Sequence, residues 1–270
     1  LIKEIFHKYF KNDLLTNGLD SAIINSINGK IAFTTDSFVV KPIFFPGGDI
    51  GKLAVYGTVN DLVVSLAKPL YLSCSFIIEE GFEVEKLKTI VKSMADACNE
   101  TKVKIVTGDT KVVEKGSVDG IFINTSGIGV IDNNYKPMKI EEGDKIIITG
   151  DIGDHGTIIA IKRYDLDFTG NIRSDCGSLL NILEELDKYK EHIKLMKDPT
   201  RGGVGTALNE ISDYADLGIE IVEKNIPISN EVLSISEILG LDPLYLANEG
   251  RAIIVVKENF ADLVLKTLRR

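Results

Sequence analysis

The stretch that decides the fold is residues 50–76, which read I-G-K-L-A-V-Y-G-T-V-N-D-L-V-V-S-L-A-K-P-L-Y-L-S-C-S-F. Its first part is rich in apolar residues and predicts a helix from Ile50 to Ala67. Pro69 ends that helix, because proline has no N–H to continue the hydrogen-bond ladder. The apolar run Leu70–Ile78 that follows predicts a buried strand. A helix leading into a buried strand is typical of a domain that mixes both kinds of element.

The rest of the chain continues this alternation of strands and helices. Strands are expected at 31–40, 105–107, 120–130, 145–149, 219–222 and 252–256, and helices at 1–10, 84–98, 155–164, 177–191, up to about 214, and at the end of the chain. A polar stretch from Asn133 to Gly143 contains Pro137 and marks a domain boundary. We therefore expect two α/β domains of similar size, 1–135 and 136–270.

Composition excludes several classes of function. The net charge of −9 and the sequence pI of about 5.0 disfavour binding to nucleic acid or to an anionic membrane surface. No apolar stretch reaches the roughly 18 residues of a transmembrane helix, and no signal peptide opens the sequence. Cys74, Cys98 and Cys176 are scattered, which suggests neither zinc nor disulfides and fits a reducing cytoplasm.

Four aspartates occupy the ends of expected strands or the turns beside them. They are Asp36 in T-T-D-S, Asp61 in V-N-D-L, Asp109 in T-G-D-T-K and Asp198 in K-D-P-T-R-G-G. Carboxylates from separate segments could converge on Mg²⁺, which prefers hard oxygen ligands and bridges them to nucleotide phosphates. Each could instead cap a helix or shape a turn, and Asp36, among strand formers, fits that alternative least.

Two glycine turns, G-D-I-G-D-H-G and R-G-G-V-G, precede expected helices, whose free N–H groups can hold phosphate. Neither turn matches a Walker loop or a dinucleotide fingerprint. Lys111 could neutralise a transferring phosphoryl group or be a surface lysine. Glu249 in A-N-E-G-R could be a base or a turn residue. His155 could contact phosphate, but a place in the first turn of a helix is favoured.

Several blocks occur in an order that resembles a known superfamily. Residues 50–76, T-T-D-S and D-P-T-R-G-G-V-G resemble aminoimidazole ribonucleotide synthetase and its relatives, including selenophosphate synthetase and thiamine-monophosphate kinase. F-F-P-G-G-D-I-G-K, I-V-T-G-D-T-K-V-V, F-I-N-T-S-G-I-G, G-D-H-G and A-N-E-G resemble one branch, the E-type hydrogenase expression/formation (HypE) family. The resemblance runs from about Ile31 to the end of the chain.

The resemblance implies an activity and a set of roles. Members of that branch use ATP to dehydrate a carboxamide, carried on their own C-terminal cysteine, to a thiocyanate that supplies cyanide ligands for the nickel–iron centre of hydrogenase. Carried over by motif, Lys111 and Glu249 are the catalytic residues, with Glu249 as the base. ATP and Mg²⁺ are held by the four aspartates, Asp36, Asp61, Asp109 and Asp198.

The resemblance also implies a PurM-like fold and partners. The first domain binds ATP and pairs its sheet across a homodimer. A carbamoyltransferase of the HypF type supplies the carbamoyl group, and a scaffold of the HypC and HypD types receives the cyano group.

Two features depart from the family pattern, and two alternatives stay open. No H-G-S-G-G segment occurs near the start, and none of the three cysteines follows Pro-Arg-Ile, so we expect a trimmed chain without its substrate-carrying sulfur. One alternative is a superfamily kinase or synthetase, of the thiamine-monophosphate kinase or selenophosphate synthetase type, acting on a free small molecule. The other is a non-catalytic scaffold that uses ATP structurally.

Overall fold

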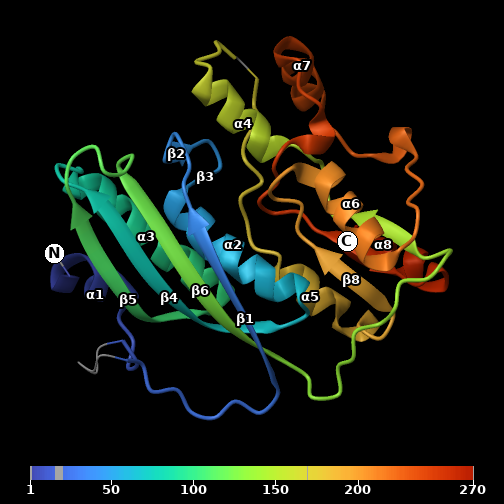
Figure 1. Ribbon diagram of the computed structural model, residues 1–270, viewed down its shortest axis with the longest axis horizontal. Coiled ribbons are helices and arrows are strands. Elements are labelled where there is room, and N and C mark those ends of the chain that lie inside the picture. Colours follow the sequence, from blue (N-terminus) through green and yellow to red (C-terminus); the bar gives the residue numbers. More distant parts are fainter. Residues whose placement is uncertain (1, 16–20, 169, 270) are drawn as a thin grey trace. The chain divides into compact units, whose positions relative to one another are not determined.

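The computed structural model describes residues 2–15, 21–168 and 170–269 (Figure 1). Its contacts divide the chain into two compact units, each with its own sheet. The first comprises Leu1–Phe44, Gly48–Val63 and Ala67–Asn134, and the second comprises Phe45–Gly47, Val64–Leu66 and Tyr135–Arg270. This is the mixed α/β architecture predicted from the sequence. No helix within the described ranges is long and apolar enough to cross a membrane.

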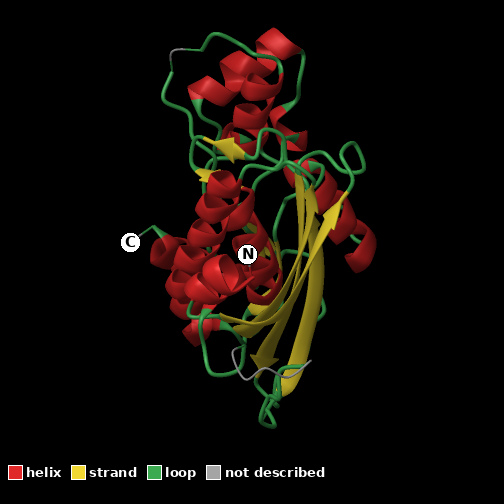
Figure 2. Ribbon diagram, turned by 90° about the vertical axis from the view of Figure 1, so that its left-hand side faces the viewer, coloured by secondary structure: helices red, strands yellow, loops and turns green. Residues whose placement is uncertain are grey.

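The first unit is built on a four-stranded sheet in the order β1-β6-β4-β5, drawn as a twisted layer in Figure 2. β6 pairs antiparallel with both β1 and β4, whereas β4 and β5 are parallel. The elements are η1 (Ile2–Phe6), α1 (His7–Phe10), β1 (Lys30–Phe38), β2 (Phe44–Phe45), β3 (Gly48–Asp49), α2 (Ile50–Val64), β4 (Lys68–Glu79), α3 (Val84–Thr101), β5 (Lys104–Val113) and β6 (Ile121–Ile131).

Helix α2 packs on one face of this sheet and is buried along most of its length. Asp49 caps its N-terminus, because its Oδ1 accepts hydrogen bonds from the backbone N–H of Gly51 (2.7 Å) and of Lys52 (3.1 Å). Thr125 of β6 donates its hydroxyl to the carbonyl of Ala54 at 2.8 Å, which ties the helix to the sheet. The thiols of Cys74, on β4, and Cys98, on α3, are both buried.

The second unit has a three-stranded antiparallel sheet in the order β7-β9-β8. Its elements are β7 (Lys145–Ile148), α4 (Asp154–Arg163), α5 (Leu180–Leu186), η2 (Asp187–Tyr189), β8 (Ile193–Lys197), α6 (Gly203–Ala215), η3 (Glu223–Asn225), α7 (Asn230–Leu239), η4 (Pro243–Tyr245), β9 (Ile253–Val256), η5 (Glu258–Phe260) and α8 (Ala261–Leu268). Its core joins α6 to the fully buried strand β9.

The two glycine turns behave as predicted. α4 begins directly after Gly153 (φ 86°) and α6 after Gly202 (φ 71°). Gly203, at the start of α6, also has a positive φ, and a Cβ there would lie 2.5 Å from the carbonyl oxygens of Leu244 and Leu246. Glycine is therefore required where this turn passes the backbone of η4.

Several expected elements differ from the structure. The strand expected at Ile105–Thr107 continues to Val113, because β4 pairs with it along its length. The strand expected at Ile219–Val222 is wrong: in the described chain this segment joins no sheet, and with β7 it lines a hollow of about 1290 Å³. The helix expected at 177–191 is α5 followed by the 3₁₀ turn η2. Strand β8 and helix α7 were not foreseen.

Candidate functional site

The segment that carries Glu249 lies between η4 and β9, and Asn248 fixes its position. The side chain of Asn248 is buried, and its Oδ1 accepts a hydrogen bond from Gly153 N at 2.7 Å. Its Nδ2 donates to the carbonyls of Pro199 (3.1 Å) and Leu246 (3.0 Å). One amide therefore joins the start of α4, the turn after β8 and its own segment.

Asp175 holds the same segment from a second side. Its side chain is 0% exposed, and its carboxylate accepts hydrogen bonds from the backbone N–H of Glu249 (3.1 and 3.2 Å) and of Gly250 (3.0 Å). A Cβ at Gly250 would lie 2.0 Å from the carbonyl oxygen of Asp175, so only glycine fits there. Two hydrogen-bonded N–H groups and this close approach fix the backbone that aims Glu249.

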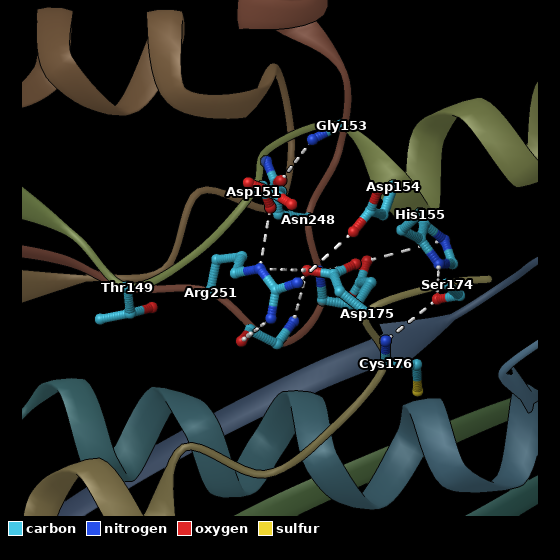
Figure 3. Close-up of polar contacts among 12 residues, drawn as sticks. Thr149, Asp151, Gly153, Asp154, His155, Ser174, Asp175, Cys176, Asn248 and Arg251 are labelled. Atoms are coloured by element: carbon cyan, nitrogen blue, oxygen red, sulfur yellow. Dashed lines mark hydrogen bonds and ion pairs between the residues drawn. The ribbon is translucent and has the colours of Figure 1, made fainter. Parts of the chain in front are cut away.

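Arg251 brings a positive charge next to Asp154 and Asp175, as Figure 3 shows. Its Nε donates to the carbonyl of Asp151 at 2.8 Å and lies 3.9 Å from Asp175 Oδ2, while one terminal nitrogen lies 3.4 Å from Asp154 Oδ2. Burial raises the pKa of Asp154 to about 6, with Asp175 and Asp151 raising it further and Arg251 opposing the shift. Asp154 can therefore change charge near neutral pH.

His155 lies in the first turn of α4, the placement favoured by the sequence, but its ring is buried and turned into the cluster. Its Nδ1 lies 2.8 Å from Ser174 Oγ (Figure 3). Its Nε2 lies 4.0 Å from Glu249 Oε1. The ring of Phe45 meets it edge-on, with 5.3 Å between centroids. Burial lowers the pKa of His155 to about 4, against the opposing effect of Asp175, so the imidazole is neutral at pH 7.

Asp198 follows β8 directly and opens the turn that leads into α6. Its neighbour Pro199 is the residue whose carbonyl accepts from both the backbone and side-chain N–H groups of Asn248. The structure therefore brings the segments of two predicted site residues, Asp198 and Glu249, side by side within the second unit.

In the first unit, Asp36 and Asp61 lie on the same side of the sheet. Thr34 donates its hydroxyl to Asp61 Oδ2 at 2.7 Å, which joins β1 to α2. Asp36, two residues further along β1, points to the same face, and its Oδ2 would lie 3.9 Å from a Cβ placed on Gly57 of α2. The two carboxylates therefore occupy the α2 side of β1.

Asp109 and Lys111 lie on the opposite side of that sheet. Both belong to β5, where Asp109 is paired with Ser75 and Lys111 with Ile77. Ile77 is 41% exposed, whereas the alternating residues of β4 point inward and are buried. Because paired residues on neighbouring strands share a face, Asp109 and Lys111 stand on the open face, away from α2.

The three predicted aspartates of the first unit therefore do not lie together on one face of its sheet. Asp36 and Asp61 share one face, Asp109 is on the other, and Asp198 belongs to the second unit. Within the described ranges, no three His, Cys, Asp or Glu side chains are arranged to hold a metal ion by themselves. Magnesium at nucleotide sites is bound through one or two carboxylates plus phosphate and water, which the pair Asp36 and Asp61 fits. The four-aspartate magnesium site stays a prediction.

Sequence reasoning missed the residues that support Glu249. Asn248 and Arg251 flank it in the quoted A-N-E-G-R block, and that block was the signal available for them. Asp175 and Ser174 lie in a stretch without helical or alternating pattern, so no local signal marks them. Their hydrogen bonds to residues 249, 250 and 155 are contacts across the chain, which only the folded structure displays.

Comparisons with known proteins cover the whole chain. Residues 18–131 match the family described as AIR synthase related protein, N-terminal domain, and residues 141–270 match its C-terminal domain. The chain is 46% identical to the carbamoyl dehydratase HypE of Bradyrhizobium diazoefficiens, over 100% of this chain and 79% of that protein.

Two solved structures are similarly close. One is the hydrogenase maturation protein HypE in complex with ATP, at 45% identity and a TM-score of 0.96, over 100% of this chain and 81% of that one. The other is a HypE–HypF complex, at 51% identity and a TM-score of 0.86, over 100% of this chain and 88% of that one.

Proposed function

This chain belongs to the HypE carbamoyl dehydratase family of AIR synthase related proteins, and from that premise we propose that it uses ATP to dehydrate a cysteine-borne carboxamide. The product is a thiocyanate that supplies cyanide ligands for the maturation of nickel–iron hydrogenase. The observation that carries the proposal is the match along the full chain to a carbamoyl dehydratase, including the rigidly held Glu249 segment.

The chemistry is balanced by two successive steps. Attack of the carboxamide oxygen on the γ-phosphorus of ATP releases ADP and converts a poor leaving group into a phosphate. Removal of the amide protons and breakage of the C–O bond then release phosphate and leave S–C≡N. The substrate loses the elements of one water, which end up in inorganic phosphate, and no oxidant or reductant is needed.

Two side chains match the demands of these steps. We assign Glu249 as the base that takes an amide proton, because its backbone is held by Asp175 and its carboxylate lies in a half-buried cluster. We assign Lys111, on the open face of the first sheet, to the developing negative charge on the transferred phosphoryl group. Bound Mg²⁺ would screen the triphosphate, and Asp36 and Asp61, on the α2 side of the sheet, would hold it. The metal-binding roles of Asp109, on the opposite face, and of Asp198, in the second unit, stay predictions.

The sulfur that carries the substrate is proposed to lie outside residues 1–270. Burial raises the pKa of the Cys98 thiol to about 12 and raises the pKa of the Cys74 thiol well above its usual range, so neither is a suitable nucleophile. Cys176 is half-buried, and its N–H donates to Ser174 Oγ at 3.0 Å. A terminal cysteine on an additional segment is the carrier implied by the resemblance to the family.

We also propose partners for the reaction. A HypF-type carbamoyltransferase would load the cysteine, as the solved HypE–HypF complex of a relative suggests. HypC- and HypD-type factors would receive the cyano group in the cytoplasm. A second copy would cover the open face of the first sheet, where Ile31 and Phe33 are 61% and 69% exposed. Sedimentation equilibrium at micromolar concentration should give twice the mass of the chain, and a monomer would contradict the dimer.

Mass spectrometry of the full-length gene product, S-carbamoylated at its terminal cysteine, tests the function. With ATP, the protein should lose the mass of one water, and the terminal cysteine should become a thiocyanate. A Cys176→Ser variant is the matched control and should react at the parent rate. Turnover that depends instead on a free small molecule would support the kinase or synthetase alternative, and no turnover of either kind would support the scaffold.

A further inference from the structure

His155 connects two groups that face it from opposite sides of its ring. On one side, Nδ1 is hydrogen-bonded to Ser174 Oγ at 2.8 Å. On the other side, Nε2 lies 4.0 Å from Glu249 Oε1, too far for a hydrogen bond but close enough that a small rotation makes one. Contacts of this kind commonly tighten when a substrate binds. The side chain is 7% exposed, so water competes little for either nitrogen.

Ser174 can serve either form of the neutral ring. Its Oγ already accepts a hydrogen bond from Cys176 N at 3.0 Å, and its own backbone N–H donates to the carbonyl of Pro46 at 2.8 Å. A hydroxyl has one donor and two acceptor positions. Ser174 can therefore donate its proton to an unprotonated Nδ1, or use its second lone pair to accept from a protonated Nδ1.

We propose that His155 is a positioning residue for Glu249, whose neutral imidazole changes tautomer as Glu249 gains and loses its proton. When Glu249 is ionised, Nε2–H donates to its carboxylate and Nδ1 accepts from the Ser174 hydroxyl. When Glu249 is protonated, its O–H donates to Nε2, and Nδ1–H donates to Ser174 Oγ. Each ring nitrogen has a partner in both states, and the imidazole carries no charge in either.

The charges around the ring are consistent with a neutral imidazole. Asp175 lies behind the Glu249 backbone and favours the charged ring, but burial outweighs it and lowers the pKa of His155 to about 4. Asp154, the neighbouring residue on α4, is engaged by Arg251, which also donates to the carbonyl of Asp151. Phe45 packs against the His155 ring in a T-shaped arrangement and brings no charge. With a neutral His155, Glu249 can act as a base, whereas a permanent cation there would favour the ionised carboxylate and make Glu249 a weaker base.

The catalytic role of His155 rests on the proposed function of Glu249 as the base. The coupling between the His155 tautomer and the protonation of Glu249 can be measured without turnover. Nitrogen NMR of the imidazoles separates the two neutral tautomers from the cation, and it can be applied to residues 1–270 as they stand. The chain has three histidines, and the signal of His155 is identified by its loss in His155→Gln. As Glu249 ionises on raising the pH, we expect the signals of the neutral His155 ring to change from the Nδ1–H to the Nε2–H tautomer.

Two variants make the outcome decisive. In Glu249→Gln the pH-dependent change of tautomer should disappear, whereas in Asp154→Asn it should persist, which excludes the neighbouring carboxylate as its cause. A single tautomer at all pH values in the parent, or an unchanged transition in Glu249→Gln, would overturn the proposal. If the His155 tautomer depends on Glu249 but the Glu249→Gln enzyme forms thiocyanate normally, the coupling is confirmed and Glu249 is not the base.

Kinetics of the full-length, carbamoylated protein add a second readout. His155→Phe, whose side chain has no polar atom, should lower kcat by roughly 10- to 100-fold with little change in KM for ATP. This is less than the roughly 100- to 10,000-fold typical of a general acid or base, because His155 acts only through Glu249. The acidic limb of the pH–rate profile should move as well. His155→Gln should recover part of the rate, because a rotated amide can present either a donor or an acceptor. Equal loss in both variants with an unmoved pH profile would mean that His155 is only structural.

Discussion

The two units hold their candidate residues in different ways. In the first, Asp36, Asp109 and Lys111 stand on regular strands, where the alternation of side chains fixes which face each one occupies. In the second, Glu249 stands on an irregular segment whose direction is set by Asn248 and Asp175. The first arrangement is a property of the sheet as a whole, whereas the second depends on a few hydrogen bonds that single substitutions can remove.

This difference separates the tasks that each region suits. Strand residues with an open face can meet a large, charged group such as a triphosphate, because their positions tolerate small shifts. A base must stay within hydrogen-bond reach of one proton, and a 1 Å error is costly. The closely tied segment around Glu249 is therefore suited to proton transfer, and the sheet and α2 of the first unit to nucleotide.

The largest effect is expected at Lys111 of the first unit, which we assign to the transferred phosphoryl group. Lys111→Ala should slow single-turnover thiocyanate formation by about 100- to 1000-fold, or about 3 to 4 kcal/mol, because one electrostatic group is lost as charge develops. ATP affinity should change little. Lys115→Ala, an exposed lysine just beyond β5, is the matched control and should have the parent rate. A parental rate in Lys111→Ala would identify it as a surface lysine.

The next largest effect concerns how tightly the Glu249 segment is held. Gly250→Ala places a Cβ 2.0 Å from a backbone oxygen that cannot move independently, so it should lower the free energy of unfolding by roughly 1–3 kcal/mol or more. Gly218→Ala, where a Cβ meets nothing within 4 Å, should stay within about 0.5 kcal/mol of the parent. Urea denaturation measures both. Equal stabilities of the two variants would show that the Glu249 segment moves easily, which would contradict its rigid support by Asp175.

A smaller effect is expected for nucleotide binding at α2. Asp61→Asn should weaken binding of magnesium-ATP by roughly tenfold, about 1.4 kcal/mol, through loss of a charged ligand. The fold should persist, because the amide oxygen can still accept from Thr34. Asp96→Asn, an exposed position on α3, is the control. Isothermal titration that finds unchanged affinity in Asp61→Asn would remove this residue from the site.

The smallest effect is a pair of opposite slopes in stability against pH. The raised pKa of Asp154, about 6 in the fold, makes stability fall as pH rises between about 4 and 6. The lowered pKa of His155, about 4, makes stability rise between about 4 and 6.5, because the unfolded chain binds the proton more readily. In the parent these two contributions oppose each other.

Removing either group should therefore change the slope of stability against pH in a known direction. Asp154→Asn should make stability fall more steeply on acidification, and His155→Gln should make it fall less steeply, each by about 1 kcal/mol per pH unit or less. Urea midpoints from pH 4 to pH 7 give both slopes. A change of the slope in the same direction in both variants would contradict the assigned ionisation states.

The sequence predicted most of the first unit, because its signals are local. The helix at Ile50 and the buried strand after Pro69 follow from apolar pattern and a proline break, and both occur as α2 and β4. Which face each strand residue occupies could not be foreseen, since it depends on the register with β4 and β6. The sequence therefore identified Asp36 and Asp109 as candidates but not their separation to opposite faces.

The second unit was harder to predict for the same physical reason. Ile219–Val222 has the composition of a strand, but a strand also needs a hydrogen-bonding neighbour, and its neighbour cannot be read from four residues. Glu249 was found through its motif, whereas Asp175 holds its backbone from 74 residues earlier in the chain, and Ser174 contacts only His155 of this group. Support of this kind is non-local and becomes visible only in the folded structure.

Rapid-quench mass spectrometry of the Glu249→Gln enzyme tests the central claim most directly. The full-length protein is carbamoylated at its terminal cysteine and mixed with ATP, and the modified cysteine is followed over a single turnover. The amide keeps the shape of the side chain but cannot take a proton. We predict near-normal ATP binding and a thiocyanate yield reduced at least roughly 100-fold, with the dehydration left incomplete. Thiocyanate formation at the parent rate would contradict Glu249 as the base and, with it, the proposed division of tasks between the units.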